Sequence, residues 1–140
     1  MRHTVIVALI ALAACGGSNS TTPVAALTVD GKWTATLVGS FTPGGSGVMA
    51  LTLTQSGATV SGSGTFTDPA DPPPAIMSVT GTVSGSSVAL TIQVLPQGTT
   101  DRNKPPMQFG GTLDNAATMS GTLSGGSPAV NSLATTFKKQ

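Results

Sequence analysis

Ser78-Val79-Thr80-Gly81-Thr82-Val83-Ser84-Gly85 is the stretch that decides the fold, because valine or glycine alternates in it with serine or threonine. Alternation with a period of two is typical of a β-strand wetted on one face. The pattern returns in Thr118-Met119-Ser120-Gly121-Thr122-Leu123-Ser124-Gly125, and Thr59-Val60-Ser61-Gly62-Ser63-Gly64 is a partial third copy. Mid-strand glycines weaken a flat sheet but permit the tight coiling that closes a sheet into a barrel. Alternatively, the repeats and their glycines have no structural role and reflect low-complexity sequence in a chain that is rich in Ser, Gly and Thr.

The rest of the chain also indicates an all-β fold. It has no glutamate and few lysines or arginines, so it contains little polar sequence that favours helices. Alternating runs separated by turn clusters predict eight strands, at residues 32–38, 47–55, 59–66, 76–84, 87–95, 107–113, 118–124 and 133–138. One face of each run is apolar and the opposite face is mostly Thr and Ser.

The lengths of the connections predict the topology. Tight turns join the second strand to the third, the fourth to the fifth and the sixth to the seventh, whereas longer loops occupy residues 39–46, 67–75, 96–106 and 125–132. In an up-and-down meander all four long loops gather at one end. We therefore expect an eight-stranded antiparallel β-barrel with a closed floor and a loop-rimmed mouth. A β-sandwich is the alternative, favoured if the first and last strands are unpaired.

The N-terminus resembles a bacterial lipoprotein signal. Arg2 precedes an apolar run at 5–12, and Leu12-Ala13-Ala14-Cys15-Gly16 places small residues directly before the single cysteine. The resemblance implies a cleaved signal peptide at 1–14, lipidation of Cys15, a flexible tether at 15–29 and one barrel domain at 30–140. Gly16 stands where aspartate would mark retention at the inner membrane, so we expect the outer membrane or the cell surface. The alternative is an ordinary secretory signal with an incidental cysteine.

Cleavage of the signal would remove a residue type on which many catalytic and metal sites depend. The only histidine, His3, lies in it, and the chain has no tyrosine and no glutamate. Most nucleophile, general-base and transition-metal sites are built from these residue types, so we expect neither an enzyme nor a metal or cofactor site. Without Arg2, five of the six basic residues remain against five aspartates. This balance gives no field that would recruit nucleic acid, and we expect a monomer.

Gly31-Lys32-Trp33 resembles the Gly-x-Trp signature that opens the first strand of lipocalins, and the same stretch is similar to the first strand of avidins. The whole meander is similar to bacterial lipocalin-like lipoproteins. The resemblance implies that Trp33 plugs the barrel floor. In lipocalins a last-strand arginine covers that tryptophan, and here only Lys138 or Lys139 could do so, as a cation–π contact.

Two functions follow from this architecture. The first is a membrane-anchored carrier of a small apolar ligand inside the barrel, for which the lining candidates near the mouth are Phe41, Phe66, Met77, Leu95 and Met107. The second is a surface structural module, or one that binds a protein or glycan through the long loops. A hollow interior would favour the carrier, and an interior filled with side chains would favour the module.

Overall fold

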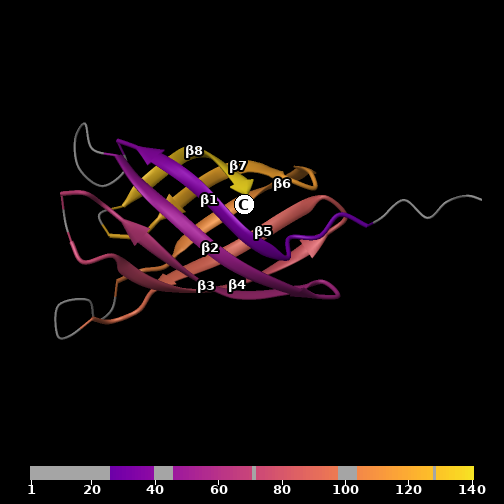
Figure 1. Ribbon diagram of the computed structural model, residues 1–140, viewed down its shortest axis with the longest axis horizontal. Coiled ribbons are helices and arrows are strands. Elements are labelled where there is room, and N and C mark those ends of the chain that lie inside the picture. The colour runs from indigo at the N-terminus through magenta and orange to yellow at the C-terminus, as the bar shows by residue number, and fades with distance from the viewer. Residues whose placement is uncertain (1–25, 40–45, 71, 98–103, 128) are drawn as a thin grey trace, which may run out of the picture.

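A computed structural model describes residues 26–39, 46–70, 72–97, 104–127 and 129–140. These residues form eight antiparallel strands, each paired with its sequence neighbours, in one closed barrel (Figure 1). The predicted fold class is confirmed. The strands are β1 (Gly31–Val38), β2 (Ser46–Ser56), β3 (Thr59–Thr67), β4 (Ala75–Ser84), β5 (Ser87–Val94), β6 (Met107–Asn115), β7 (Thr118–Gly125) and β8 (Val130–Lys139).

Pairing between the first and last strands closes the sheet. Trp33 lies opposite Lys139, and Thr34 lies opposite Lys138. Because β1 and β8 are paired, the sandwich alternative is wrong, and the described sheet has no unpaired edge strand.

The barrel has two unlike ends. The floor end carries residues 26–30, the end of β8 and the short turns β2–β3, β4–β5 and β6–β7 (Figure 1). The mouth end carries the connections β1–β2, β3–β4, β5–β6 and β7–β8. This is the arrangement that the loop lengths predict, because an odd-numbered connection in an antiparallel meander always returns to the same end.

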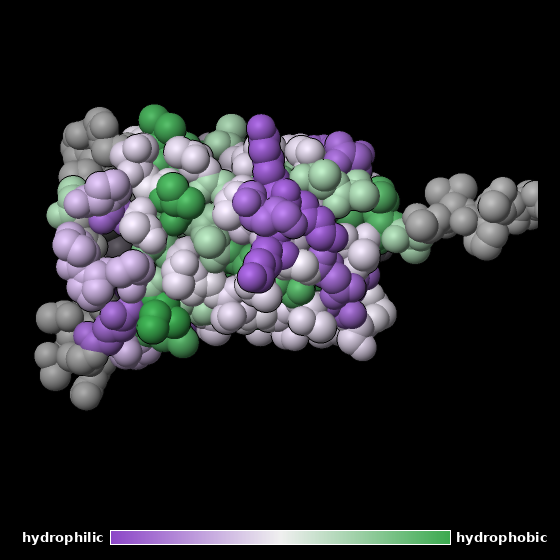
Figure 2. Space-filling model, in the orientation of Figure 1, coloured by the Kyte–Doolittle hydropathy of each residue, from purple (hydrophilic) through white to green (hydrophobic). Residues whose placement is uncertain are grey.

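The core lies inside the barrel. Its buried members come from all eight strands and form one cluster, and the largest fully buried side chains are Trp33, Phe109, Phe137, Leu37, Met49, Leu51, Met77, Leu90, Ile92, Leu113, Met119 and Leu123. The outer wall carries mostly Thr and Ser, so it is mainly pale in Figure 2, with a few apolar patches. Burial alternates along most of each strand, and this alternation is why the strands could be predicted from the sequence pattern.

The inward glycines let neighbouring strands approach very closely. Gly111 and Gly121 face each other across β6 and β7, and a Cβ on Gly121 would lie 2.5 Å from the Cα of Gly111 and closer still to the Gly110 carbonyl oxygen. No side chain fits there without movement of the backbone. These glycines are therefore a steric requirement of the closed barrel rather than weak points in a flat sheet.

Most strand ends lie within two residues of the prediction, and the start of β8 differs by three. β8 begins at Val130 instead of residue 133, because a bulge at Ser132, with φ of 52°, turns both Val130 and Leu133 toward the interior. The bulge breaks the period of two, so alternation alone misses the start of the strand. β5 ends at Val94, one residue early, and the amide of Leu95 donates to the carbonyl of Ile76.

Candidate functional site

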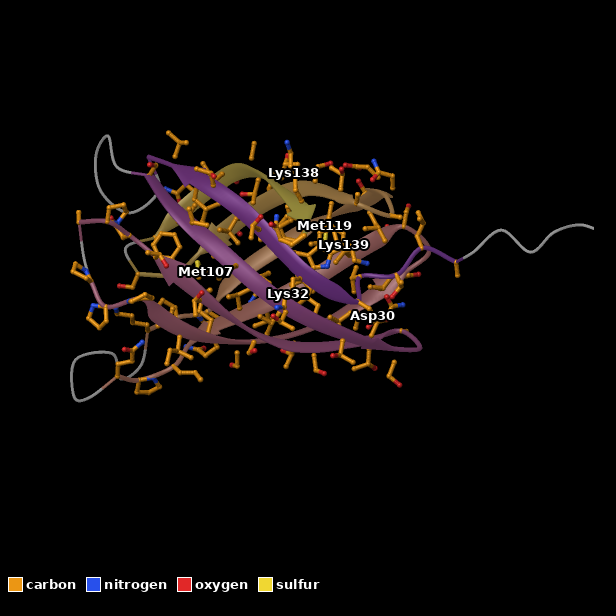
Figure 3. All side chains as sticks on the ribbon, in the orientation of Figure 1. Asp30, Lys32, Met107, Met119, Lys138 and Lys139 are labelled. Carbon is orange, nitrogen blue, oxygen red and sulfur yellow. The ribbon has the colours of Figure 1, made fainter. Side chains whose placement is uncertain are left out.

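Trp33 closes the floor. Its side chain is fully buried, and its Nε1 donates a 2.7 Å hydrogen bond to the carbonyl oxygen of Val29. The Nζ of Lys139 lies 5.4 Å from the centroid of the Trp33 ring, within the range of a cation–π contact. Of the two candidate lysines, Lys139 covers the ring, and Lys138 as the floor residue is corrected to Lys139. Phe137 and Lys139 point inward, so Lys138 between them must point outward, and it is exposed (Figure 3).

Gly31 explains the first position of the Gly-x-Trp motif. Its φ is 116°, in the region that favours glycine, and a Cβ there would lie 2.8 Å from the Cε of Lys139. The stem of Lys139 therefore passes directly over Gly31 on its way to the Trp33 ring. Gly31, Trp33 and Lys139 form a single packed unit.

A polar clasp ties the entering chain to the end of β2. The carboxylate of Asp30 accepts hydrogen bonds from the backbone amide of Gln55 and, at 2.7 Å, from the Thr28 hydroxyl. In return, the Gln55 side-chain oxygen accepts a 3.0 Å bond from the amide of Val29. The amide of Gln55, then the hydroxyl of Thr28, and to a lesser extent the charge of Lys139, hold the pKa of Asp30 below its ordinary value.

The predicted ligand residues and the predicted lipidation site, Cys15, separate into three groups. Met77 and Met107 lie in the core, and Phe66 is half-buried against it. Leu95 lies outside the core, is 38% exposed and neighbours Ile76 at the outer rim of the mouth. Phe41 and Cys15 lie outside the described residues.

Buried side chains from all eight strands form one packed cluster in the part of the interior that the structure describes. Phe109 and Phe137 meet edge-to-face with ring centroids 5.3 Å apart in the middle of the barrel. Above them Met77 is fully buried and Met107 nearly so, and Figure 3 places Met107 toward the mouth end. The ring of Phe66 packs over Gly47 in the same upper layer. A ligand at the predicted positions would have to displace these side chains.

The outer wall has features that the sequence interpretation missed. Four large apolar side chains on it are exposed in an arc near the mouth, namely Val38, Val48, Ile76 and Leu95. A groove of about 370 Å³ crosses the outside of β1 to β4, between Lys32 with Gln140 at one end and Ile76 at the other. The sequence feature that could have predicted this apolar surface is the presence of aliphatic residues at outward positions, where Thr and Ser are more common. They break the polar face of an otherwise regular alternation.

The described residues contain no group of three or more His, Cys, Asp or Glu side chains that could hold a metal ion. No helix among them is long and apolar enough to cross a membrane. Comparison of the chain with family models, with curated proteins and with solved structures found no match.

Proposed function

We propose that this protein is a lipid-anchored, monomeric, non-enzymatic binding module of the bacterial cell envelope, held at the outer membrane or cell surface through Cys15. The observation that carries the proposal is the separation of the two barrel ends. The chain enters at the floor, beside Trp33, and all four long connections lie at the opposite end. The predicted tether at 15–29 is too long at its C-terminal end, because Thr28 is hydrogen-bonded in the clasp and Val29 is buried in the core. A shorter tether that ends before Thr28 would present the mouth away from the lipid.

The packing of the interior favours a module that acts through its mouth over a carrier. Truncating one buried Met or Leu typically costs 2–5 kcal/mol, so opening a ligand cavity among such side chains costs a comparable amount unless the ligand replaces their contacts. Binding at the mouth would leave these core side chains in place. Prolines in the β3–β4 and β5–β6 connections, such as Pro72 and Pro105, would lower the entropy lost when a partner binds.

Replacing the acceptor cysteine tests the anchor. The variant Cys15→Ser should move from the membrane fraction to the soluble fraction, and it should lose the mass of the acyl groups. The wild-type chain should resist washing with high salt. Unchanged membrane partitioning of Cys15→Ser would contradict the proposal.

The orientation can be tested with the same chain, because an acylated Cys15 leaves it without a free thiol. A fluorophore would be attached to Ala116→Cys at the floor or to Asn131→Cys at the mouth, both at exposed positions. In vesicles whose headgroups carry a quencher, the floor label should be quenched more strongly than the mouth label. Equal quenching, or stronger quenching at Asn131→Cys, would overturn the orientation.

A further inference from the structure

The barrel closes along a seam, the line between β1 and β8, that is paired over only part of its length. Trp33 pairs with Lys139 and Thr34 with Lys138, whereas the ladders between the other neighbouring strands run over most of each strand. Both pairs lie at the floor end, where the end of β8 meets β1 (Figure 1). Toward the mouth, no ladder pair joins Ala35–Val38 to β8 in the part of the chain that the structure describes.

The backbone of this stretch of β1 points hydrogen-bonding groups into the seam. The amide of Gln140 donates a 2.9 Å bond to the carbonyl oxygen of Lys32, so Lys32 directs its backbone groups toward β8. Successive residues of an antiparallel strand direct these groups to opposite neighbours. Thr36 and Val38, in phase with Lys32, therefore direct their amides and carbonyls toward β8, where no ladder pair of the described residues receives them.

The facing stretch of β8 presents a matching edge. The amide of Lys139 donates a 2.9 Å bond to the carbonyl oxygen of Ala117, which lies on the β7 side. By the same alternation, Thr136 and Ala134 direct their amides and carbonyls away from β7 and into the seam. Two strand edges with free hydrogen-bonding capacity therefore face each other in the mouth half of the seam.

No charged or proline side chain among the described residues protects these edges. The outward side chains along them, Thr36, Val38, Ala134 and Thr136, are small or β-branched, and all four are exposed. Val38 is 67% exposed, more than the other exposed large apolar side chains of the described residues. Natural sheets usually guard an open edge with lysine, proline or a covering segment. The first charge along the seam is Lys138, where the strands are already paired.

The core limits the side chains that can enter the seam. Leu37 and Thr135 point inward beside it and are almost fully buried. An entering strand would meet these packed side chains with its inner face, which favours glycine or alanine at alternate positions. Its outer side chains would lie beside Val38 and remain accessible, so larger apolar residues fit there.

We propose that the mouth half of the seam binds an extended, uncharged peptide segment of a partner protein, which pairs antiparallel with β1 as an added strand. The free stretch of β1, Ala35–Val38, is about 13 Å of extended chain. The amides and carbonyls of Thr36 and Val38 bond the peptide backbone, and the Val38 side chain packs against an outward apolar residue. Glycans and lipids lack the alternating amides and carbonyls that such an edge recognises. The site lies on the side wall and is independent of the anchor and of the proposed role of the mouth loops.

Hydrogen exchange in the free chain tests whether the edge is open. The amide of Thr36 should exchange with solvent at least ten-fold faster than those of Ala35 and Leu37, which face the β2 ladder. The full chain carrying Cys15→Ser would be used. Equal protection of Thr36 and its two neighbours would overturn the proposal, because it would mean that the β1–β8 ladder continues toward the mouth.

Peptide titration tests the partner. The end-capped peptide acetyl-Thr-Ala-Val-Ala-Thr-Ala-amide would be added to the same chain while the backbone amide signals are followed by NMR. The signals of Thr36, Val38 and Thr136 should shift, saturate and become protected, and that of Leu90 in the core should stay fixed. The same peptide with N-methylated amides cannot donate hydrogen bonds and should not bind. Equal binding of the methylated peptide, or shifts spread over all strands, would overturn the proposal.

Matched variants at Val38 separate the backbone from the side chain. Val38→Pro removes an amide that faces the seam and none that bonds β2, so it should weaken peptide binding about ten-fold with little change in stability. Val38→Thr keeps the amide and the branched shape, and it should weaken binding less than about three-fold. Unfolding curves verify the fold of both variants. Equal binding by the two variants would contradict the proposal, and so would a dimer in sedimentation that Val38→Pro dissociates, since it would assign the edge to a second copy.

Discussion

The ammonium of Lys139 lies 5.4 Å from the ring centroid of Trp33, directly across the β1–β8 pair that closes the barrel. One contact therefore joins the first strand, the last strand and the floor of the core. The adjacent Lys138 carries the same charge but points to solvent. The two lysines form a natural comparison between a structural and a surface cation.

Replacing each lysine measures that difference. Lys139→Ala should lower the free energy of unfolding by about 1–2 kcal/mol, since it removes both the cation–π contact and the stem packed over Gly31. Lys138→Ala should change it by less than about 0.5 kcal/mol. Urea unfolding followed by Trp33 fluorescence provides the measurement. Equal losses would show that Lys139 acts only as a surface charge.

Closure of the barrel depends on the backbone contact at Gly121. Gly121→Ala should destabilise the protein by about 3 kcal/mol or more, because the new methyl group meets the backbone of Gly110 and Gly111. Gly110→Ala is the matched control. Nothing lies within 4 Å of a Cβ at Gly110, so that variant should be neutral or slightly more stable. Thermal unfolding separates the two, and a tolerated Gly121→Ala would contradict the steric argument.

Neighbouring residues in β4 test the register. Met77 is fully buried and Ile76 is half-exposed, although both side chains are large and apolar. Met77→Ala should cost about 2–5 kcal/mol in unfolding free energy, and Ile76→Ala less than about 1 kcal/mol. Denaturant unfolding measures both. A larger loss for Ile76→Ala would mean that β4 is shifted by one residue, which would turn its apolar face outward.

Most of the fold could be predicted from the sequence because burial alternates in nearly every strand. Val79, Val83 and Leu123 each lie between a Ser and a Thr, so the inward face could be predicted from the sequence. The bulge at Ser132 was not visible, because it depends on how β7 and β8 fit together in the closed barrel. Strand pairing, rather than local pattern, fixes that position.

The site was less predictable than the fold. The sequence predicts a barrel with a mouth, but whether the interior is hollow depends on how the inward side chains, such as Met77 and Met107, pack together in three dimensions. Which lysine covers Trp33 depends on the end of β8, where one residue of shift exchanges Lys138 and Lys139. The outer groove needs the register of four strands at once. The small residues Ala50 and Ser63 are recognised as lining the groove only when the positions of Lys32 and Ile76 on the neighbouring strands are also known.

Acid should loosen the clasp at Asp30. The pKa of this carboxyl group is lowered in the folded chain, first by the amide of Gln55 and then by the hydroxyl of Thr28. The stability it contributes is fully present above the unfolded value of about 3.9, and it is lost as the pH falls through the lower folded value. Asp30→Asn lacks this contribution at neutral pH. Wild-type and variant stabilities should therefore differ at pH 7 and converge once the pH falls below the lowered pKa of Asp30.

Asp114 gives the matched comparison. The hydroxyls of Ser120 and Thr112 also lower its pKa, but it lies on the outer wall of β6 and holds no entering chain. Asp114→Asn should flatten the acid dependence in the same direction. Only Asp30→Asn should also speed amide hydrogen exchange at Val29 and Gln55, because the clasp bonds both amides. Urea unfolding from pH 7 to 2.5 measures the stabilities. An unchanged pH slope in Asp30→Asn would refute the role of the clasp.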